Sequence, residues 1–281
     1  MMININNLDF SFRKQFLLFN QLNLNIDKGS ITGLLGKNGA GKTTLLKLIC
    51  GLLKPGKGII STKGFCPGQR HVEMLQQIFF VPEEFHLPDV SIRDYVKAQG
   101  IFYPTFDDEM MTKILSEFHL KSWQYLKHLS YGQKKKFLIA FALSTRCSIL
   151  VLDEPTNGLD IPSKSLFRKI MAGSLSDDQL VIISTHQVKD VENLLDQLIV
   201  LEDGKVVFQQ TLHNISKDYY FGAAGSLQGI DALYTENAPG GYRFISAARN
   251  GNSSQVDLEL LFNAIISGNL NSKNHAVTTT I

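Results

Sequence analysis

The stretch Ile31–Leu53, ITGLLGKNGAGKTTLLKLICGLL, decides the fold of this chain. It begins with a short apolar run, continues with the loop Gly36–Thr43, which fits G-x-x-x-x-G-K-[ST], and ends in a stretch of helical character. Glycines let successive backbone N–H groups turn toward one anion, and the N-terminus of the following helix adds partial positive charge. Strand, loop and helix in this order predict a phosphate-binding loop, with a plain glycine turn beside an exposed lysine as the alternative.

The residue types in this loop suit a nucleoside triphosphate. We expect Lys42 to neutralise charge on the β- and γ-phosphate oxygens and the Thr43 hydroxyl to reach Mg²⁺. Thr44 is expected to donate a hydrogen bond on the α-phosphate side. The rest of the predicted cradle consists of Gly36, Lys37, Asn38, Gly39, Ala40 and Gly41.

A second candidate site follows the apolar segment Ile149–Leu152, which predicts a buried strand that ends in two acids, Asp153 and Glu154. In open α/β sheets, function gathers at the carboxyl ends of the strands. We expect Asp153 to hold Mg²⁺, through water, and Glu154 to polarise the attacking water. A strand running into an acidic surface turn is the alternative, and the phosphate loop upstream argues against it.

Apolar runs alternate with helical stretches along most of the chain, which predicts a doubly wound α/β fold. Leu22, Leu24 and Ile26 alternate with polar residues as in a half-buried strand, whereas the other runs are continuous, as in strands buried on both faces. These runs are 31–35, 78–81, 149–152, 180–183 and 198–201. The predicted helices are 42–51, 92–98, 107–118, 133–143 and 164–171.

The composition narrows the class of protein. Of the 281 residues 44% are hydrophobic and 19% are charged, and the net charge of +2 gives no basic footprint for a nucleic acid. The longest unbroken apolar run, Phe137–Leu143, is far below the roughly 20 residues of a membrane helix. Three widely spaced cysteines suit a reducing compartment, and the first residues show no signal-peptide pattern. We therefore expect a cytosolic protein that does not insert into a membrane.

After about Gln210 the chain changes character, because glycines divide it into short pieces. One helix is predicted here from Leu258 onward, with Ser254 and Asp257 as its capping box and Gly268 at its end. The polar tail 269–281 is expected to be disordered.

Together with the phosphate loop, four short motifs resemble those of ATP-binding cassette (ABC) proteins over about residues 1–210. Leu129–Gln133, LSYGQ, resembles the LSGGQ signature, and Pro155–Asp160 resembles the D-loop. Ser184–His186 is similar to the switch-histidine motif, and Phe12 stands where the family carries an aromatic residue that stacks on adenine. A core aromatic is the alternative for Phe12, and a structural histidine is the alternative for His186.

The resemblance implies a P-loop NTPase core of the ABC type: a mainly parallel sheet, an antiparallel N-terminal β subdomain and a helical signature subdomain inserted at 84–145. The chain would then divide into an ATPase domain, 1–210, and a small α+β extension, 211–281. In the family, the signature caps the γ-phosphate held by the other subunit, because the two ends of one chain are too far apart to meet. The residues that this assigns to ATP are Ser130, Gly132, Gln133 and Asp160, with His186 and Glu154 in catalysis.

Part of this pattern can be read without the family. Ser130 and Gln133 form an S-x-x-Q capping box, and a capped helix N-terminus is an anion site, although any helix can begin in this way. The run Lys134–Lys136 that follows is expected to be the solvated face of this helix.

Two residues depart from the family pattern. Glu83 stands where the family usually has a glutamine that touches Mg²⁺ and senses the membrane partner. A glutamate can also coordinate Mg²⁺, or it can serve only at the partner contact. Tyr131 replaces a signature glycine, while Ser130, Gly132 and Gln133 are present, so we expect a working signature.

The expected function is that of an ATP-hydrolysing subunit that dimerises on ATP, as a homodimer or pseudo-dimer, and drives a separate transmembrane permease. The single cassette with its extension resembles ATPase subunits of ABC-2-type exporters, which places the chain on the inner face of the cell membrane through its partner. A soluble ABC ATPase serving another assembly is the alternative. The 88 residues from Lys42 to Ser130 leave no room for the long coiled coil of repair proteins, and ribosome-type members carry two cassettes. A regulator without turnover is disfavoured by Glu154 and His186.

Overall fold

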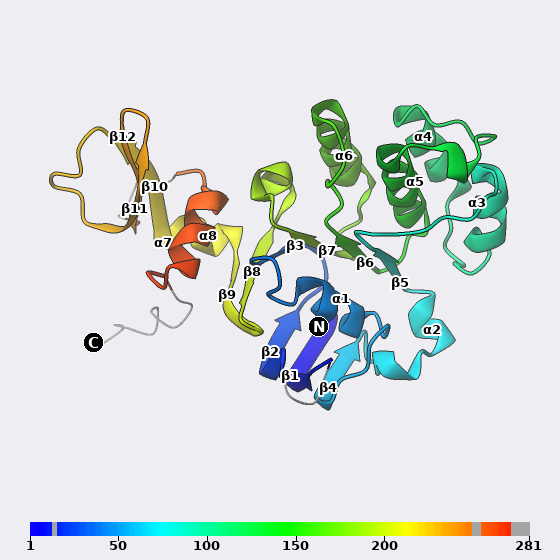
Figure 1. Cartoon of the computed structure of the whole chain (residues 1–281), viewed down its shortest axis with the longest axis horizontal. Helices are drawn as coiled ribbons and strands as arrows, with labels where there is room; N and C mark the ends of the chain where they lie inside the picture. Colours follow the sequence, from blue (N-terminus) through cyan, green and yellow to red (C-terminus); the bar gives the residue numbers. More distant parts are fainter. Residues whose placement is uncertain (13–15, 249–253, 271–281) are drawn as a thin grey trace.

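The computed structural model of the chain describes residues 1–12, 16–248 and 254–270. Its centre is a six-stranded sheet in the order β5-β6-β7-β3-β8-β9 (Figure 1). Its first five strands are parallel, and β9 pairs antiparallel with β8. The strands are β3 (Ser30–Leu35), β5 (Ile78–Val81), β6 (Ile149–Asp153), β7 (Leu180–Thr185), β8 (Gln197–Glu202) and β9 (Lys205–Thr211).

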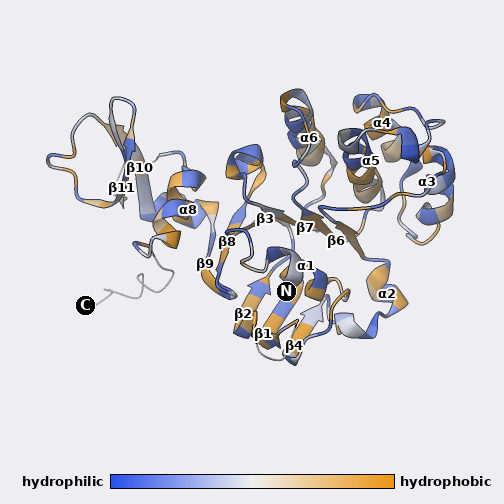
Figure 2. Ribbon diagram, viewed as in Figure 1, coloured by the Kyte–Doolittle hydropathy of each residue, from blue (hydrophilic) through white to orange (hydrophobic). Residues whose placement is uncertain are grey.

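The continuous apolar runs of the sequence account for the middle of this sheet. Every residue of β6 and β7 is buried, because helices cover one face and the N-terminal sheet with its helix covers the other (Figure 1). Figure 2 shows the hydrophobic colouring of these central strands. The predicted mainly parallel α/β sheet is therefore confirmed.

A smaller antiparallel sheet, in the order β2-β1-β4, lies beneath the central one, as expected for an N-terminal β subdomain. Its strands are β1 (Ile3–Phe10), β2 (Phe19–Ile26) and β4 (Lys57–Thr62). Helix α1 (Lys42–Ile49) lies between the two sheets and shares a buried core with both (Figure 1). The alternation predicted for Leu22–Ile26 is confirmed, since Leu22, Leu24 and Ile26 are buried and the residues between them are exposed.

A group of helices separates β5 from β6 and lies at one end of the molecule (Figure 1). It contains α3 (Ile92–Gly100), α4 (Asp108–Glu117) and α5 (Tyr131–Ser144), and the three helices predicted here are confirmed, with ends that differ by at most two residues. Phe137–Leu143 is buried on all sides because α5 packs against both α4 and β5. The other short helices are η1 (Pro67–Gln69), α2 (Val72–Leu75), η2 (Leu126–His128), η3 (Val188–Asp190) and η4 (Glu192–Leu194).

One prediction for α5 is wrong. Lys134–Lys136 is not a solvated face, since Lys135 has no exposed surface at all. The position of this residue explains the error: Lys135 stands three and four residues before Leu138 and Ile139, so it lies on the helix face that is turned into the protein.

The C-terminal part forms a three-stranded antiparallel sheet, β10-β12-β11, at the opposite end of the molecule from the helical group (Figure 1). Its hydrophobic residues join the same buried core as the central sheet, and α8 packs against η3 and β8. This part therefore completes the core of the sheet that it follows. The elements of this part are α7 (Leu212–Asp218), β10 (Tyr219–Ala224), β11 (Ala232–Ala238), β12 (Gly241–Ala247) and α8 (Leu258–Ile266). The remaining helix, α6 (Ile161–Ser174), connects β6 to β7.

The predicted start of α8 is wrong in one detail. Asp257 alone caps the helix, by accepting a hydrogen bond from the backbone N–H of Leu260, whereas the hydroxyl of Ser254 accepts one from the backbone N–H of Phe221. Gly268, with φ of 78°, follows the last turn as predicted. Of the tail that was expected to be disordered, Asn269 and Leu270 are placed, with Leu270 buried, and 271–281 lies outside the described residues.

Among the helices that the structure describes, none combines the length and the apolar character that crossing a lipid bilayer requires.

Candidate functional site

The phosphate loop joins β3 to the first turn of α1, as the sequence predicted. Gly41 is the N-cap of α1 with φ of 104°, and a Cβ on it would meet the ring of Phe19 at 2.8 Å. A Cβ on Gly36 would lie 2.4 Å from the carbonyl oxygen of Leu201. Both positions therefore require glycine, and the loop backbone turns at the positive end of a helix that can receive an anion.

The Lys42 side chain folds back over this loop. Its ammonium group donates hydrogen bonds to the carbonyl oxygens of Gly36, at 2.8 Å, and of Lys37, at 3.4 Å. Burial lowers the pKa of Lys42, and the carboxylates of Glu154, Asp153 and, less strongly, Glu83 oppose that shift. A partly desolvated ammonium group beside a loop of this kind can exchange carbonyl partners for phosphate oxygens.

Asp153 ends β6 directly opposite Ser184 on β7. It is 1% exposed, and each of its carboxylate oxygens has a partner: Thr43 donates to one at 2.8 Å, and the Ser184 hydroxyl donates to the other. Thr43 and Asp153 thus present two hard oxygen ligands side by side, which is the donor set that Mg²⁺ prefers.

The pairing of Thr43 with Asp153 is also the test of whether Mg²⁺ fits. Across the described residues, no three His, Cys, Asp or Glu side chains gather as a cage for a metal ion. Mg²⁺ does not need such a cage, because it is usually held by one or two side chains together with substrate phosphates and water. The residues present therefore fit this ion.

Glu154 and His186 lie in contact beyond the same strand ends. The Glu154 carboxylate is 2.8 Å from Nδ1 of His186 and accepts a hydrogen bond from Thr185 Oγ1 at 3.2 Å. Its backbone has φ of 46°, a left-handed conformation held by hydrogen bonds from its N–H to the carbonyl and hydroxyl oxygens of Ser184. A strained residue held in place by its neighbours is typical of functional sites.

Glu83 follows β5 and reaches the same place from the other side. Its carboxylate accepts a hydrogen bond at 2.8 Å from the side-chain amide of Asn157, which lies in the turn after Glu154. Three carboxylates, those of Glu83, Asp153 and Glu154, therefore meet around one hollow.

This hollow, of about 490 Å³, is the candidate active site. The Phe12 side chain stands at its edge, 69% exposed, with its ring edge-to-face against Phe10 at 5.0 Å. One face of the Phe12 ring is thus free to stack on a planar group. The hollow is lined by Phe12, Leu18, Asn38, Gly39, Gly41, Lys42, Thr43, Thr44, Glu83, Asp153, Glu154 and His186.

Not every predicted residue lines the hollow. The Lys37 ammonium group points away, to Glu202 at 3.4 Å, and Ala40 is buried behind the loop. The signature residues Ser130, Gly132 and Gln133 do not line it either, and neither does Asp160.

The signature nevertheless has the predicted local structure. Ser130 caps α5, and the capping box with Gln133 is complete, because each side chain bonds the other residue's backbone N–H. Gly132 lies so close to the next loop that a Cβ on it would be 3.0 Å from the carbonyl oxygen of Gly158. Asp160 caps α6 in the same manner as Ser130 caps α5, accepting from the backbone N–H of Ser163 at 2.9 Å.

Several residues that position this site had no predicted role of their own. Ser184, Thr185 and Asn157 hold the carboxylates, and their signal was present, since each follows a predicted strand or a catalytic residue. Lys135 gave no such signal. It is buried against the segment that carries Glu83, and desolvation there lowers its pKa to about 8. The negative charges of Glu83 and, more weakly, of Asp153 and Glu154 raise this pKa and so offset part of the shift.

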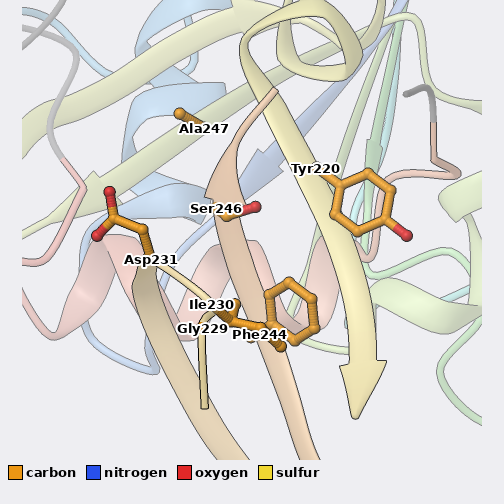
Figure 3. Close-up of a pocket in the computed structure, with 7 residues that line it drawn as sticks. All are labelled: Tyr220, Gly229, Ile230, Asp231, Phe244, Ser246 and Ala247. Carbon is orange, nitrogen blue, oxygen red and sulfur yellow. The ribbon is translucent and has the colours of Figure 1, made fainter. Parts of the chain in front are cut away.

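A second hollow, of about 230 Å³, lies on the C-terminal sheet and is built from other chemistry (Figure 3). Its polar groups are the Asp231 carboxylate and the Tyr220 and Ser246 hydroxyls, beside the ring of Phe244. None of its lining residues belongs to a sequence motif, and none of them is a lysine or an arginine. Of these two hollows, the larger one is therefore the candidate for the catalytic site.

Known proteins resemble this chain in sequence. Residues 19–157 match the family described as ABC transporter. The chain is 31% identical over 201 residues to the ABC transporter ATP-binding protein NatA of Bacillus subtilis, covering 69% of this chain and 82% of that protein. It is 35% identical over 193 residues to the SkfA peptide export ATP-binding protein SkfE of Bacillus subtilis, covering 66% and 80%. It is also 34% identical over 203 residues to the Nod factor export ATP-binding protein I of Burkholderia lata, covering 70% and 67%.

Solved structures show the same fold. A structure titled as the ATP binding subunit of an ABC transporter superposes with a TM-score of 0.70 and 24% identity, over 76% of this chain and 92% of the other. The structure of cbiO1 from Clostridium perfringens, part of the transporter complex cbiONQ, superposes with a TM-score of 0.63 and 25% identity, over 76% and 90%. The family match over residues 19–157 and the relatives that are more than 30% identical make the chain a member of the ABC transporter family, in which it is an ATP-binding ATPase subunit.

Proposed function

We propose that two copies of this chain, or this chain and a similar one, close head to tail on two ATP molecules, and that closure and hydrolysis drive export through a separate membrane subunit. One observation carries the proposal. The candidate active site holds the phosphate loop, the acids and His186, but Ser130 at the start of α5 does not line it. A second chain related by a two-fold axis would supply its own capped α5 terminus to the open side of each ATP.

The chain's own residues divide the chemical work. The loop backbone and Lys42 would bind the β- and γ-phosphates, with Thr44 toward the α-phosphate and Phe12 stacked on adenine. Thr43 and Asp153 would hold Mg²⁺, with Glu83 as a third oxygen ligand. When bound, this ion supplies neutralisation of charge on the phosphate oxygens.

Hydrolysis would then proceed at the Glu154 carboxylate. Glu154 accepts a proton from water as the water oxygen bonds to the γ-phosphorus, and the bond from that phosphorus to the β–γ bridging oxygen breaks to release ADP and phosphate. His186, 2.8 Å from Glu154, would orient this carboxylate and donate a hydrogen bond toward the γ-phosphate. Asp160 and the partner's signature would close the site.

The membrane subunit is proposed to bind near Glu83–Pro88 and the helical group, at the cytoplasmic face of the membrane. Large hydrophobic side chains are exposed on that group, among them Ile101, at 75%, and Trp123, at 72%. Exposed apolar residues of this size are typical of a surface that a partner covers. Export is supported by the relatives that are named for peptide export and Nod factor export.

The experiment for head-to-tail closure is to trap the dimer. Glu154→Gln removes the proton acceptor but keeps its size, so ATP with Mg²⁺ should move this variant from monomer to dimer on a sizing column. Adding Ser130→Arg places a bulky side chain at the signature and should abolish the shift. A monomer with ATP bound, or a dimer that survives Ser130→Arg, would contradict the proposal.

A further inference from the structure

The buried ammonium group of Lys135 is the strongest feature that the catalytic assignment leaves unexplained. It lies in α5 with no exposed surface and donates hydrogen bonds to the carbonyl oxygens of Pro82 and Glu83, both at 3.2 Å. It also lies 5.4 Å from the centre of the Phe85 ring, on which it can make a cation–π contact. A buried charge without a carboxylate in direct contact is costly, so its presence requires an explanation.

Tyr131 binds the same segment from one helical turn earlier. Its hydroxyl donates to the carbonyl oxygen of Glu83 at 2.6 Å, and its ring stacks on Phe85 with the centres 5.3 Å apart. Tyr131 and Lys135 are four residues apart, so they project from one face of α5. Together they hold residues 82–85, the segment that leaves β5 and carries Glu83 to the active site.

The charges around this segment show what Lys135 adds. Glu83, Asp153 and Glu154 bring three carboxylates to one hollow, and among its described lining residues Lys42 is the one lysine or arginine. The carbonyl-bound ammonium group of Lys135 lies behind Glu83, so it offsets the negative charge that Glu83 adds to this site.

We propose that Lys135 is a positioning residue that supplies the counter-charge for Glu83 and fixes residues 82–85 so that the Glu83 carboxylate lies at the active site. Lys135 touches no substrate; it acts through the backbone and charge of Glu83. Loss of its ammonium group would take the side-chain donor from the Pro82 carbonyl oxygen and leave the Glu83 carbonyl oxygen with the Tyr131 hydroxyl. It would also leave three carboxylates with less compensation, and the segment would withdraw from the site. The inference rests on the proposed function through the place of Glu83 at the ATP site, and its test by thermal melting of the nucleotide-free protein does not depend on dimer closure.

The first test separates positioning from a merely structural role. Lys135→Met keeps the length of the side chain and removes the buried charge but leaves the Glu83 carboxylate in place, so some loss of stability is expected. At a temperature where the variant stays folded, we expect an ATP dissociation constant without Mg²⁺ within about threefold and a turnover rate at least about tenfold lower. Full activity, or loss of activity only in step with loss of stability, would overturn the proposal.

The second test asks whether the positive charge of Lys135 compensates the negative charge of Glu83. In a double-mutant cycle, Lys135→Met should cost turnover much less when Glu83→Gln is already present, because the added carboxylate is gone. The same cycle followed by thermal melting of the nucleotide-free protein should show Glu83→Gln to be more favourable in the Lys135→Met protein than in the parent. Equal effects in both backgrounds would overturn the counter-charge.

Two further variants serve as matched controls. Tyr131→Phe removes only a hydrogen bond to the Glu83 backbone, so its smaller effect on turnover should be the same with Glu or Gln at position 83. Lys135→Gln keeps a donor for one carbonyl oxygen and loses the charge, so it should lose turnover as Lys135→Met does. A Lys135→Gln protein with full turnover would refute the counter-charge and does not depend on Lys135→Met folding.

Discussion

Lys42 and Lys37 stand five residues apart in one loop and face different surroundings. The Lys42 ammonium group is folded over the loop among buried groups, whereas that of Lys37 is mostly exposed and points to Glu202. Charge that lies in a partly desolvated site stabilises a phosphoryl transition state far more than charge at the solvent surface. The two lysines therefore form a matched pair for testing the site.

Lys42→Ala should lower ATP turnover at least about 100-fold and weaken nucleotide binding, because it removes a preorganised cation from the phosphate site. Lys37→Ala should retain most of the activity, since its side chain does not line the hollow. Phosphate release measured on the two purified proteins checks both. Turnover close to the parent in Lys42→Ala would rule out the assignment of the phosphate loop.

Several helices of this chain begin at a residue whose side chain caps the first turn. Helix α8 begins at Asp257, whose carboxylate accepts the backbone N–H of Leu260 at 2.9 Å and also pairs with Arg243 at 3.2 Å. Both charged side chains are about one-third exposed, so solvent screens the ion pair and leaves the cap as the larger contribution.

Asp257→Ala should therefore lower the free energy of unfolding by about 1 kcal/mol, through loss of the cap. Asp257→Asn keeps an oxygen in the capping position and removes the charge, so it should cost a fraction of that. Urea denaturation of the two variants provides the measurement. If Asn and Ala at this position cost the same, the ion pair and not the cap stabilises this end of α8.

The strands, the loop and the helix start that the sequence predicted correctly depend on residues close together in the chain. Continuous apolar runs marked β6 and β7, and a glycine loop between a run and a helix marked the phosphate site, because neighbours in the chain make those structures. Ser130 and Gln133 marked the start of α5 for the same reason. A cap or a turn depends on residues within one helical turn, so a single sequence is enough to find it.

Features made by distant parts of the chain were missed. Lys135 reads as one of three surface lysines, and its burial depends on Pro82 and Glu83, which lie about fifty residues earlier. Ser254 was assigned to the cap of α8, but a strand thirty-three residues away takes its hydroxyl. Strands β1, β4 and β9 were not predicted either, since much of each is polar or half-buried and only pairing partners make them strands.

The whole molecule is held by cores that cross from one part to another. Leu258, Leu261 and Ile265 of α8 are at most 2% exposed and belong to the buried cluster that contains Leu198 and Val200 of the central sheet. The ion pair between Glu259 and Lys189, at 2.7 Å, joins α8 to the short helix that follows His186. The C-terminal part should therefore unfold with the ATPase core.

Scanning calorimetry of the full chain should show one cooperative transition, which ATP moves upward as a whole because ATP binds only the folded state. Leu261→Ala should lower that single transition by an amount that corresponds to about 2–5 kcal/mol, although it lies far from the nucleotide. Lys189→Ala, at an exposed ion pair, is the control that should change it little. Two peaks, of which ATP moved only one, would contradict the shared core.

A shared core also bears on how this chain could be reshaped. A domain with a core of its own can be fused to another protein through a linker, without changes to the surface of that protein. Helix α8 could not be transferred in this way, since its apolar face is complementary to the central sheet and to η3 of this protein. Exchange of the C-terminal part, in the laboratory or in evolution, would succeed only together with matching changes on that surface.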